Sequence, residues 1–188
     1  MPEETRVTAQ TENAASAAHL AALIRDVEDF PKKGILFKDI TTLLKDPEAF
    51  RMAIDMLAEP FKDLGIEVVV GMESRGFIFA APLAYKLNAG FVPVRKLGRL
   101  PAEAVRVEYS LEYGSNVLEI HRDAIQPGQR VLVVDDLLAT GGTVLATVNL
   151  VEQLGGKVAG IGFLAELTFL NGRENLDRHE NVISIISY

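Results

Sequence analysis

One stretch restricts the fold more than any other: a run of apolar residues leads into two adjacent aspartates and a glycine-rich turn. Arg130–Val134 has no polar alternation after its first residue, which is typical of a strand covered on both faces. From Val131 to Thr143 the string reads VLVVDDLLATGGT, and a helix is expected to begin at Gly142. A strand, a glycine turn and a helix in this order predict a mainly parallel, twisted sheet flanked by helices.

The same alternation recurs along most of the chain. Because continuous apolar strands alternate with helical segments, we expect an α/β fold in which ligands bind beyond the carboxyl ends of the strands. Strands are expected at Ile66–Met72, Phe91–Val94, Val158–Leu164 and Val182–Ser187, and helices at Arg75–Leu87 and Gly142–Leu154.

Three segments depart from this rhythm. Residues 1–15 are polar and lack periodicity, so they predict a disordered N-terminal tail. Apolar spacing predicts a helix from Ser16 to about Phe30, and Asp46-Pro47 predicts the start of another that runs to about Leu64. Lys96–Arg122 predicts two antiparallel strands joined around Gly114-Ser115. Since no second core is evident, we expect a single domain over residues 16–188.

The composition excludes several classes of function. A net charge of −7 over 188 residues, without basic runs, argues against nucleic acid or an anionic membrane as partner. No apolar run is long enough to cross a bilayer, and the N-terminus does not resemble a secretory signal. Cysteine is absent, which excludes disulfides, thiolate catalysis and cysteine-bound zinc, and the three histidines lack metal-ligand spacing. We expect a cytoplasmic location.

The aspartates and the glycine turn suit a sugar phosphate. Asp135 and Asp136 follow the apolar strand, and adjacent carboxylates at the ligand-binding edge can accept hydrogen bonds from ribose hydroxyls. In Ala139–Thr143 the glycines allow a ligand to approach the backbone, and unpaired amides at a helix N-terminus favour a phosphate dianion. The string is neither a Walker A loop nor a GxGxxG fingerprint. A solvated turn before a helix is the alternative, which the whole string disfavours.

The string VLVVDDLLATGGT resembles the phosphoribosyl-pyrophosphate motif of type I phosphoribosyltransferases. The resemblance implies the fold of that family, with ribose hydroxyls held by Asp135 and Asp136. It also implies a requirement for Mg²⁺, which would be held mainly by the pyrophosphate of the substrate and not by dedicated protein ligands. The residues that would hold the 5′-phosphate are Ala139, Thr140, Gly141, Gly142 and Thr143.

A second strand-to-helix junction, Gly71–Gly76, resembles the pyrophosphate loop of the same family. There the peptide between the residues matching Glu73 and Ser74 is typically cis and turns backbone N–H groups toward the pyrophosphate. Arg75 would be a catalytic cation that stabilises the leaving group; a surface arginine at a helix start is the alternative. The residues that would close over the pyrophosphate from a mobile basic loop are Arg95, Lys96 and Arg99.

Further segments resemble the adenine-specific branch of this family, the adenine phosphoribosyltransferases. With them the resemblance extends from about Ile24 to the C-terminus and includes an N-terminal hood segment. The segments are FPKKGILFKDITTLLKDP (Phe30–Pro47), VPVRKLGRLP (Val92–Pro101), EYSLEYG (Glu108–Gly114) and LAELTFLNGRENL (Leu164–Leu176).

In that branch the base is adenine. The resemblance implies that the backbone of Leu36 donates to N1 and accepts from the 6-amino group, while Phe37 and Leu167 sandwich the ring. Core packing is the alternative for Phe37. Lys38 stands where many relatives carry arginine, and it keeps the charge without the planar fork of a guanidinium.

A loop that folds over the substrates is matched by Tyr109, Glu112 and Tyr113. Glu112 would lie near the N7 side of the purine, and it is the catalytic candidate for organising or moving the purine proton. A carboxylate fits this task only if it lies within hydrogen-bond reach of the base.

The implied reaction is that of adenine with phosphoribosyl pyrophosphate, giving AMP and pyrophosphate, by an enzyme that is a homodimer. Two alternatives remain open. One is transfer to a 6-oxopurine such as xanthine, guanine or hypoxanthine, whose reversed hydrogen-bond pattern would mismatch the Leu36 backbone. The other is a non-catalytic regulator that senses phosphoribosyl pyrophosphate, although the chain shows no basic patch for nucleic acid.

Overall fold

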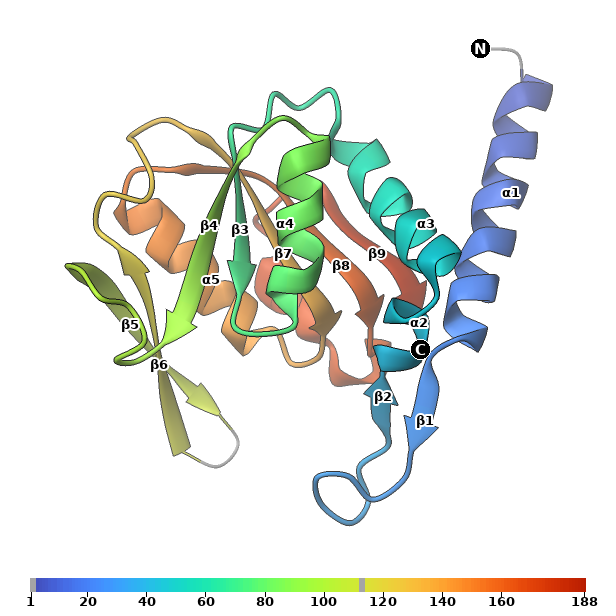
Figure 1. Cartoon of the computed structure of the whole chain (residues 1–188), viewed down its shortest axis with the longest axis horizontal. Coiled ribbons are helices and arrows are strands. Elements are labelled where there is room, and N and C mark those ends of the chain that lie inside the picture. Colours follow the sequence, from blue (N-terminus) through green and yellow to red (C-terminus); the bar gives the residue numbers. More distant parts are fainter. Residues whose placement is uncertain (1–2, 112–113) are drawn as a thin grey trace. The chain divides into compact units, whose positions relative to one another are not determined.

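The computed structural model describes residues 3–111 and 114–188, with side chains described for 12–109 and 116–188. Two compact units are present, Met1–Met56 (unit 1) and Leu57–Tyr188 (unit 2), where the sequence predicts a single domain over 16–188. Figure 1 shows the elements of both units in chain order. No helix of the described residues is long and apolar enough to span a membrane.

In its described residues, 3–56, unit 1 holds three helices and a short hairpin. The helices are α1 (Glu3–Ala22), α2 (Thr41–Leu44) and α3 (Pro47–Ala58), whose last two residues fall in unit 2. The antiparallel strands are β1 (Arg25–Val27) and β2 (Phe37–Asp39). Asp46 caps α3, because its Oδ1 accepts the backbone N–H groups of Glu48 and Ala49 at 3.0 Å.

The N-terminal segment differs from the expectation of a tail followed by a helix at Ser16–Phe30. Helix α1 includes most of residues 1–15, and its many alanines and glutamates have high helix propensity. The helix ends at Ala22, because Arg25–Val27 pairs with Phe37–Asp39 and this pairing overrides the helical spacing of the apolar residues.

Unit 2 is built on a seven-stranded sheet in the order β5-β6-β4-β3-β7-β8-β9. The neighbouring strands β4, β3, β7, β8 and β9 are parallel to one another. Strands β5 and β6 form an antiparallel hairpin at one edge, as the sequence predicts. The strands are β3 (Val68–Met72), β4 (Gly90–Lys96), β5 (Ala104–Leu111), β6 (Gly114–His121), β7 (Arg130–Leu138), β8 (Lys157–Glu166) and β9 (Val182–Ser187).

Strand β7 is longer than the predicted Arg130–Val134. It continues to Leu138 because its pairing with β8 extends to the pair Leu138 and Glu166. The two aspartates therefore lie within the strand and not in a loop after it, and their backbone is held by the sheet.

Two longer helices connect the parallel strands of unit 2. Helix α4 (Gly76–Lys86) links β3 to β4, and α5 (Gly142–Gln153) links β7 to β8. These connections lead in opposite directions from the centre of the sheet, so right-handed crossovers place the helices on opposite faces. Figure 1 shows α4 in front of the sheet and α5 behind it. The order in which strands are added to the sheet thus reverses between β3 and β7, and α/β proteins bind ligands at such a position.

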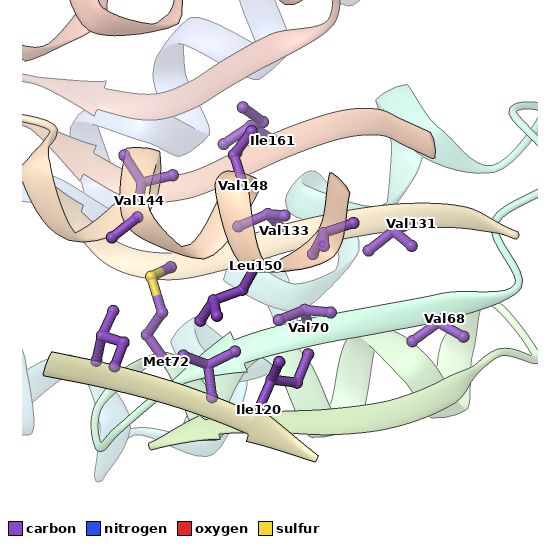
Figure 2. Close-up of a cluster of buried hydrophobic side chains, with 14 of the residues drawn as sticks. Val68, Val70, Met72, Ile120, Val131, Val133, Val144, Val148, Leu150 and Ile161 are labelled. Carbon is purple, nitrogen blue, oxygen red and sulfur yellow. The ribbon is translucent and has the colours of Figure 1, made fainter. Parts of the chain in front are cut away.

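A large hydrophobic cluster of unit 2 lies between the sheet and α5. Figure 2 shows side chains of β3, β7 and β8, among them Val70 and Val133, directed toward side chains of α5 such as Val148. The strand glycines have a packing role as well. A Cβ on Gly160 of β8 would lie 2.7 Å from the ring of Phe61, in the short helix η1 (Glu59–Phe61), so the glycine makes room for this buried ring.

Candidate active site

The acidic pair lies on β7 at the carboxyl end of the sheet. Asp136 is buried, with 4% of its surface exposed, and its Oδ2 lies 3.0 Å from the Nε of Arg75. Asp135 is half-buried and lines a small open cleft, and its Oδ1 accepts the backbone N–H of Asp136 at 2.9 Å. The structure thus pairs Asp136 with Arg75, although the sequence analysis assigns Asp136 to the ribose and Arg75 to the pyrophosphate.

Both aspartates resist ionisation. Burial, and after it the neighbouring carboxylate of Asp136, raise the pKa of Asp135 well above its usual value. Burial also raises the pKa of Asp136, although the nearby Arg75 guanidinium opposes that effect. Among the described residues, no group donates a hydrogen bond of suitable geometry to Asp136 Oδ2, although Arg75 is close enough to form an ion pair with it. Full ionisation of the pair is therefore costly, and a bound hydrogen-bond donor or cation would stabilise the charged form.

The glycine turn after β7 forms the rest of this cleft, which is lined by the whole of Ala139–Thr143. Gly141 is the N-cap of α5 and has a left-handed backbone, with a φ of 82°. Over the described ranges 3–111 and 114–188, no backbone carbonyl accepts a hydrogen bond from the backbone N–H groups of Thr140, Gly141 and Gly142. Free amides at the N-terminus of a twelve-residue helix are suited to bind a phosphate.

The loop after β3 lies beside this cleft, because β3 and β7 are neighbours. The peptide between Glu73 and Ser74 is cis, as expected from the resemblance. Arg75 is the N-cap of α4, and the next residue packs against the acidic pair: a Cβ on Gly76 would lie 2.8 Å from Asp135 Oδ1. The two loops thus meet at the position where the chain reverses its direction across the sheet.

Two of the three predicted loop cations belong to strand β4. Arg95 and Lys96 are its last residues, and both bind Glu73: Arg95 Nη2 lies 3.3 Å from Oε1, and the Lys96 backbone N–H donates to Oε2 at 3.1 Å. Although burial raises the pKa of Glu73, these hydrogen bonds lower it below the usual value. Arg99 alone of the three lies in the loop that follows, and its carbonyl accepts from Arg95 Nη1 at 3.0 Å.

Glu119 holds the loop that follows β4, a role that the sequence did not indicate. It lies on β6, is almost fully buried, and its Oε1 accepts the backbone N–H groups of Arg99 and Leu100 at 3.0 and 3.1 Å. Its other oxygen faces Arg106 Nε at 3.3 Å. An acidic residue between apolar neighbours in the string VLEIH was a signal for such an anchor.

The predicted substrate-covering loop is described in part. Tyr109 on β5 is half-buried, and its hydroxyl oxygen lies 3.4 Å from the donating Oγ1 of Thr143, which links the hairpin to the phosphate turn. The catalytic candidate Glu112 and the loop residue Tyr113 lie outside the described residues.

The predicted adenine-binding residues are divided between the two units. Leu36, Phe37 and Lys38 belong to unit 1, and Leu167 belongs to unit 2. Leu36 is exposed, the Phe37 ring packs edge-on against Phe30 with centroids 5.0 Å apart, and Lys38 Nζ lies 2.7 Å from Asp26 Oδ1. Lys38 is thus engaged with a carboxylate of its own hairpin. Leu167 is half-buried directly after β8.

Comparison with known proteins relates this site to a family. Residues 39–186 match the family described as the phosphoribosyl transferase domain. The adenine phosphoribosyltransferase of Alkaliphilus metalliredigens is 61% identical over 170 residues, covering 90% of this chain and 99% of the relative.

Solved structures give the same result. The crystal structure of adenine phosphoribosyltransferase from Thermoanaerobacter pseudethanolicus has a TM-score of 0.88 and 55% identity, and the match covers 92% of this chain and 99% of that one. The Saccharomyces cerevisiae adenine phosphoribosyltransferase, solved with an imino-altritol bisphosphate and adenine, has a TM-score of 0.86 and 41% identity, with 92% and 99% covered.

Proposed function

The chain belongs to the adenine phosphoribosyltransferase family of type I phosphoribosyltransferases, and on that premise we propose that it transfers the phosphoribosyl group of phosphoribosyl pyrophosphate to adenine, giving AMP and pyrophosphate. The identity of the base is supported by the A. metalliredigens relative, an adenine phosphoribosyltransferase, and by the yeast relative that was solved with adenine. The chemistry is a glycosyl transfer that serves purine salvage.

One observation carries the proposal: an acidic pair with a phosphate-binding turn lies directly beside the Glu73–Arg75 loop at the carboxyl edge of the sheet. A sugar that carries a phosphate at one end and a pyrophosphate at the other needs these three elements next to one another. Asp135 and Asp136 would accept the ribose hydroxyls, and the turn Ala139–Thr143 would donate to the 5′-phosphate.

The leaving pyrophosphate gains negative charge as the bond to the sugar breaks. Arg75 is held beside Asp136, so its guanidinium is oriented before the substrate arrives and needs little reorganisation. Glu73 and Ser74 would contribute the backbone of the loop, and Arg95, Lys96 and Arg99 would approach the pyrophosphate from the end of β4 and the loop after it. Since Arg95 is bound to Glu73, pyrophosphate would compete with that carboxylate for the guanidinium.

For the purine that accepts the phosphoribosyl group, the support is the resemblance to adenine phosphoribosyltransferases. By that resemblance, Leu36, Phe37, Lys38 and Leu167 would bind adenine. Glu112 remains the proposed group for organising the purine proton, with Tyr109 and Tyr113 in the loop that covers the substrates.

Magnesium fits the acidic pair only in part. Carboxylate oxygens are ligands that Mg²⁺ prefers, and Asp135 and Asp136 offer them beside the proposed ribose position. Among the described residues, no group of three or more potential ligand side chains could hold a metal. We therefore propose that Mg²⁺ is bound mainly by substrate oxygens, with these carboxylates nearby. When bound, it would neutralise charge on the pyrophosphate.

A homodimer and a cytoplasmic location remain proposals. The dimer is supported by apolar side chains exposed on α4 and β4 of unit 2, namely Ile78, Tyr85 and Phe91. Light scattering at several concentrations would test it, and a constant monomer mass would contradict it.

The function is tested by giving the protein Mg²⁺, phosphoribosyl pyrophosphate and one purine base at a time. AMP formed from adenine, with no nucleotide from guanine, hypoxanthine or xanthine, is the expected result. A nucleotide formed from an oxopurine alone would assign the other purine specificity. Tight binding of phosphoribosyl pyrophosphate without any product would indicate a regulator instead.

A further inference from the structure

A short helix far along the chain lies against the outer side of the phosphate turn. This helix, η3 (Gly172–Leu176), follows β8 and the shorter helix η2 (Thr168–Leu170). The Nδ2 of its Asn175 donates to the carbonyl oxygen of Thr140 at 2.8 Å. Both segments belong to unit 2, and the two hydrogen-bonded residues are 35 positions apart in the sequence.

The backbones of η3 and the turn are in direct contact. A Cβ placed on Gly172 would lie 2.0 Å from the carbonyl oxygen of Ala139 and 3.0 Å from the nitrogen of Gly141. From the other side, a Cβ on Gly141 would lie 2.5 Å from the carbonyl oxygen of Gly172. Real side chains do not approach backbone this closely, so neither position has room for a methyl group.

Helix η3 is in turn fastened to strands β8 and β9. The Arg173 guanidinium binds the buried carboxylate of Glu166 at the end of β8, with Nε 3.1 Å from Oε1. It also donates to Val182 O at 2.9 Å and to Ser184 Oγ at 3.0 Å, both on β9. The turn therefore rests on a segment that is anchored to the sheet, and not on a free loop.

The contact from Asn175 bears on the amides that would bind phosphate. In a trans peptide the carbonyl and the following N–H point in opposite directions. Because Asn175 draws the Thr140 carbonyl toward η3, the N–H of Gly141 is directed away from that hydrogen bond, which suits donation to a ligand on the other side of the turn. This is one of the amides that donate to no backbone carbonyl in the described part of the chain.

We propose that Gly172 and Asn175 are positioning residues that hold the phosphate turn in its binding shape. The inference rests on the proposed function, because it assumes that Ala139–Thr143 binds the 5′-phosphate of the sugar. Asn175 is exposed and acts on the ligand only through the Thr140–Gly141 peptide.

The test separates the two ends of the substrate by using ribose 5-phosphate and inorganic pyrophosphate as separate probes. For Asn175→Ala we expect the Kd of ribose 5-phosphate to rise about five- to tenfold, as for the loss of one hydrogen bond. The Kd of pyrophosphate and the KM for adenine should change less than about twofold. Asn175→Asp also lacks the donor, and it should weaken ribose 5-phosphate at least as much.

Asn181→Asp is the matched control. Asn181 is also exposed, and its Nδ2 donates to the carbonyl of Ala159 at 3.2 Å, near the start of β8 and away from the site. Both aspartate variants lose one amide donor to a backbone carbonyl and gain one charge. Only the Asn175 variant should weaken ribose 5-phosphate.

Gly172→Ala addresses the backbone contact. Because the methyl group would force η3 and the turn apart, we expect at least a tenfold loss of ribose 5-phosphate affinity. Since this variant can also fail to fold, the Asn175 variants decide the matter. An unchanged Kd for ribose 5-phosphate in Asn175→Ala, which removes the donor without adding a charge, or an equal loss for pyrophosphate, overturns the proposal. A wild-type protein that makes no AMP would instead refute the proposed function.

Discussion

Two acidic sites at the same edge of the sheet differ in what surrounds them. Glu166 ends β8, while Asp135 and Asp136 lie near the end of the neighbouring β7. Glu166 and Asp136 are almost equally buried, with 5% and 4% of their surface exposed. Hydrogen bonds from Arg173, and secondarily from Ser184, lower the pKa of Glu166, whereas burial raises the pKa values of both aspartates.

The difference separates a structural acid from acids that are available to a ligand. The carboxylate of Glu166 is occupied by an arginine and a serine, and it fastens η3 to the sheet. The aspartates are held close together, with Arg75 as the nearby cation. Ionising them in the folded protein is costly, and a ligand that donates hydrogen bonds or brings a cation recovers that cost.

Arg75 should show the largest effect. Arg75→Gln removes the oriented cation next to the acidic pair, and we expect kcat to fall about 100- to 1000-fold, as for loss of a preorganised donor to developing charge. Steady-state kinetics with adenine would measure this. Arg122→Gln breaks an exposed ion pair with Glu103 and should stay within twofold of wild type. A kcat for Arg75→Gln within threefold of wild type would remove Arg75 from the mechanism.

Asp135 should come next. Asp135→Asn keeps the oxygen that accepts the Asp136 backbone N–H but removes the carboxyl group that could ionise toward a bound ligand in the cleft. We expect kcat/KM for phosphoribosyl pyrophosphate to fall about 10- to 100-fold, the range for a hydrogen bond to a charged group. Asp123→Asn, in an exposed turn, serves as the control. If both variants behave alike, the acidic pair has no special role in ribose binding.

The sequence predicted one half of this comparison well and the other half not at all. The string VLVVDDLLATGGT identified the strand, both aspartates and the turn, because these residues are adjacent in the chain and form one local unit. The cis peptide at Glu73–Ser74 and the family were also predicted, and both are confirmed. Glu166 lies beyond the predicted end of its strand at Leu164 and was not singled out, since its partners Arg173 and Ser184 come from later segments.

The errors have the same origin. Strand β7 exceeds its predicted end at Val134, because pairing with β8 holds Asp135–Leu138 in the sheet. Helix α1 ends before its predicted limit, because Arg25–Val27 pairs with residues farther along the chain. Glu119 was missed for a similar reason: its acceptor role depends on the Arg99–Leu100 backbone, which only the fold brings near β6.

The stability of the Glu166 site gives a smaller effect of known sign. Glu166→Gln should lower the free energy of unfolding by about 2 kcal/mol, which corresponds to a drop in Tm of about 4–8 °C. A lowered carboxyl pKa contributes stability above the usual glutamate value and loses it as the pH falls through the lowered value. The difference from wild type should therefore be largest at pH 7 and shrink below about pH 4.

Calorimetry from pH 3 to pH 8 would measure this difference. Glu152→Gln, which breaks a more exposed pair with Arg178, should shift Tm by no more than about 2 °C. A Glu166→Gln variant as stable as wild type at pH 7 would contradict the anchoring role of Glu166.

Removing the charge of Asp135 should change the stability in the direction opposite to Glu166→Gln, and this is the smallest expected effect. Because its pKa is raised, the folded protein holds the proton more tightly than the unfolded chain does. Wild-type stability is therefore lost as the pH rises from the usual aspartate value toward the raised one, and Asp135→Asn avoids that loss. Its Tm should exceed that of wild type by a few degrees at pH 7, and the excess should vanish toward pH 4. A lower Tm at pH 7 would mean that Asp135 is a structural acid like Glu166, and the contrast between the two strand ends would disappear.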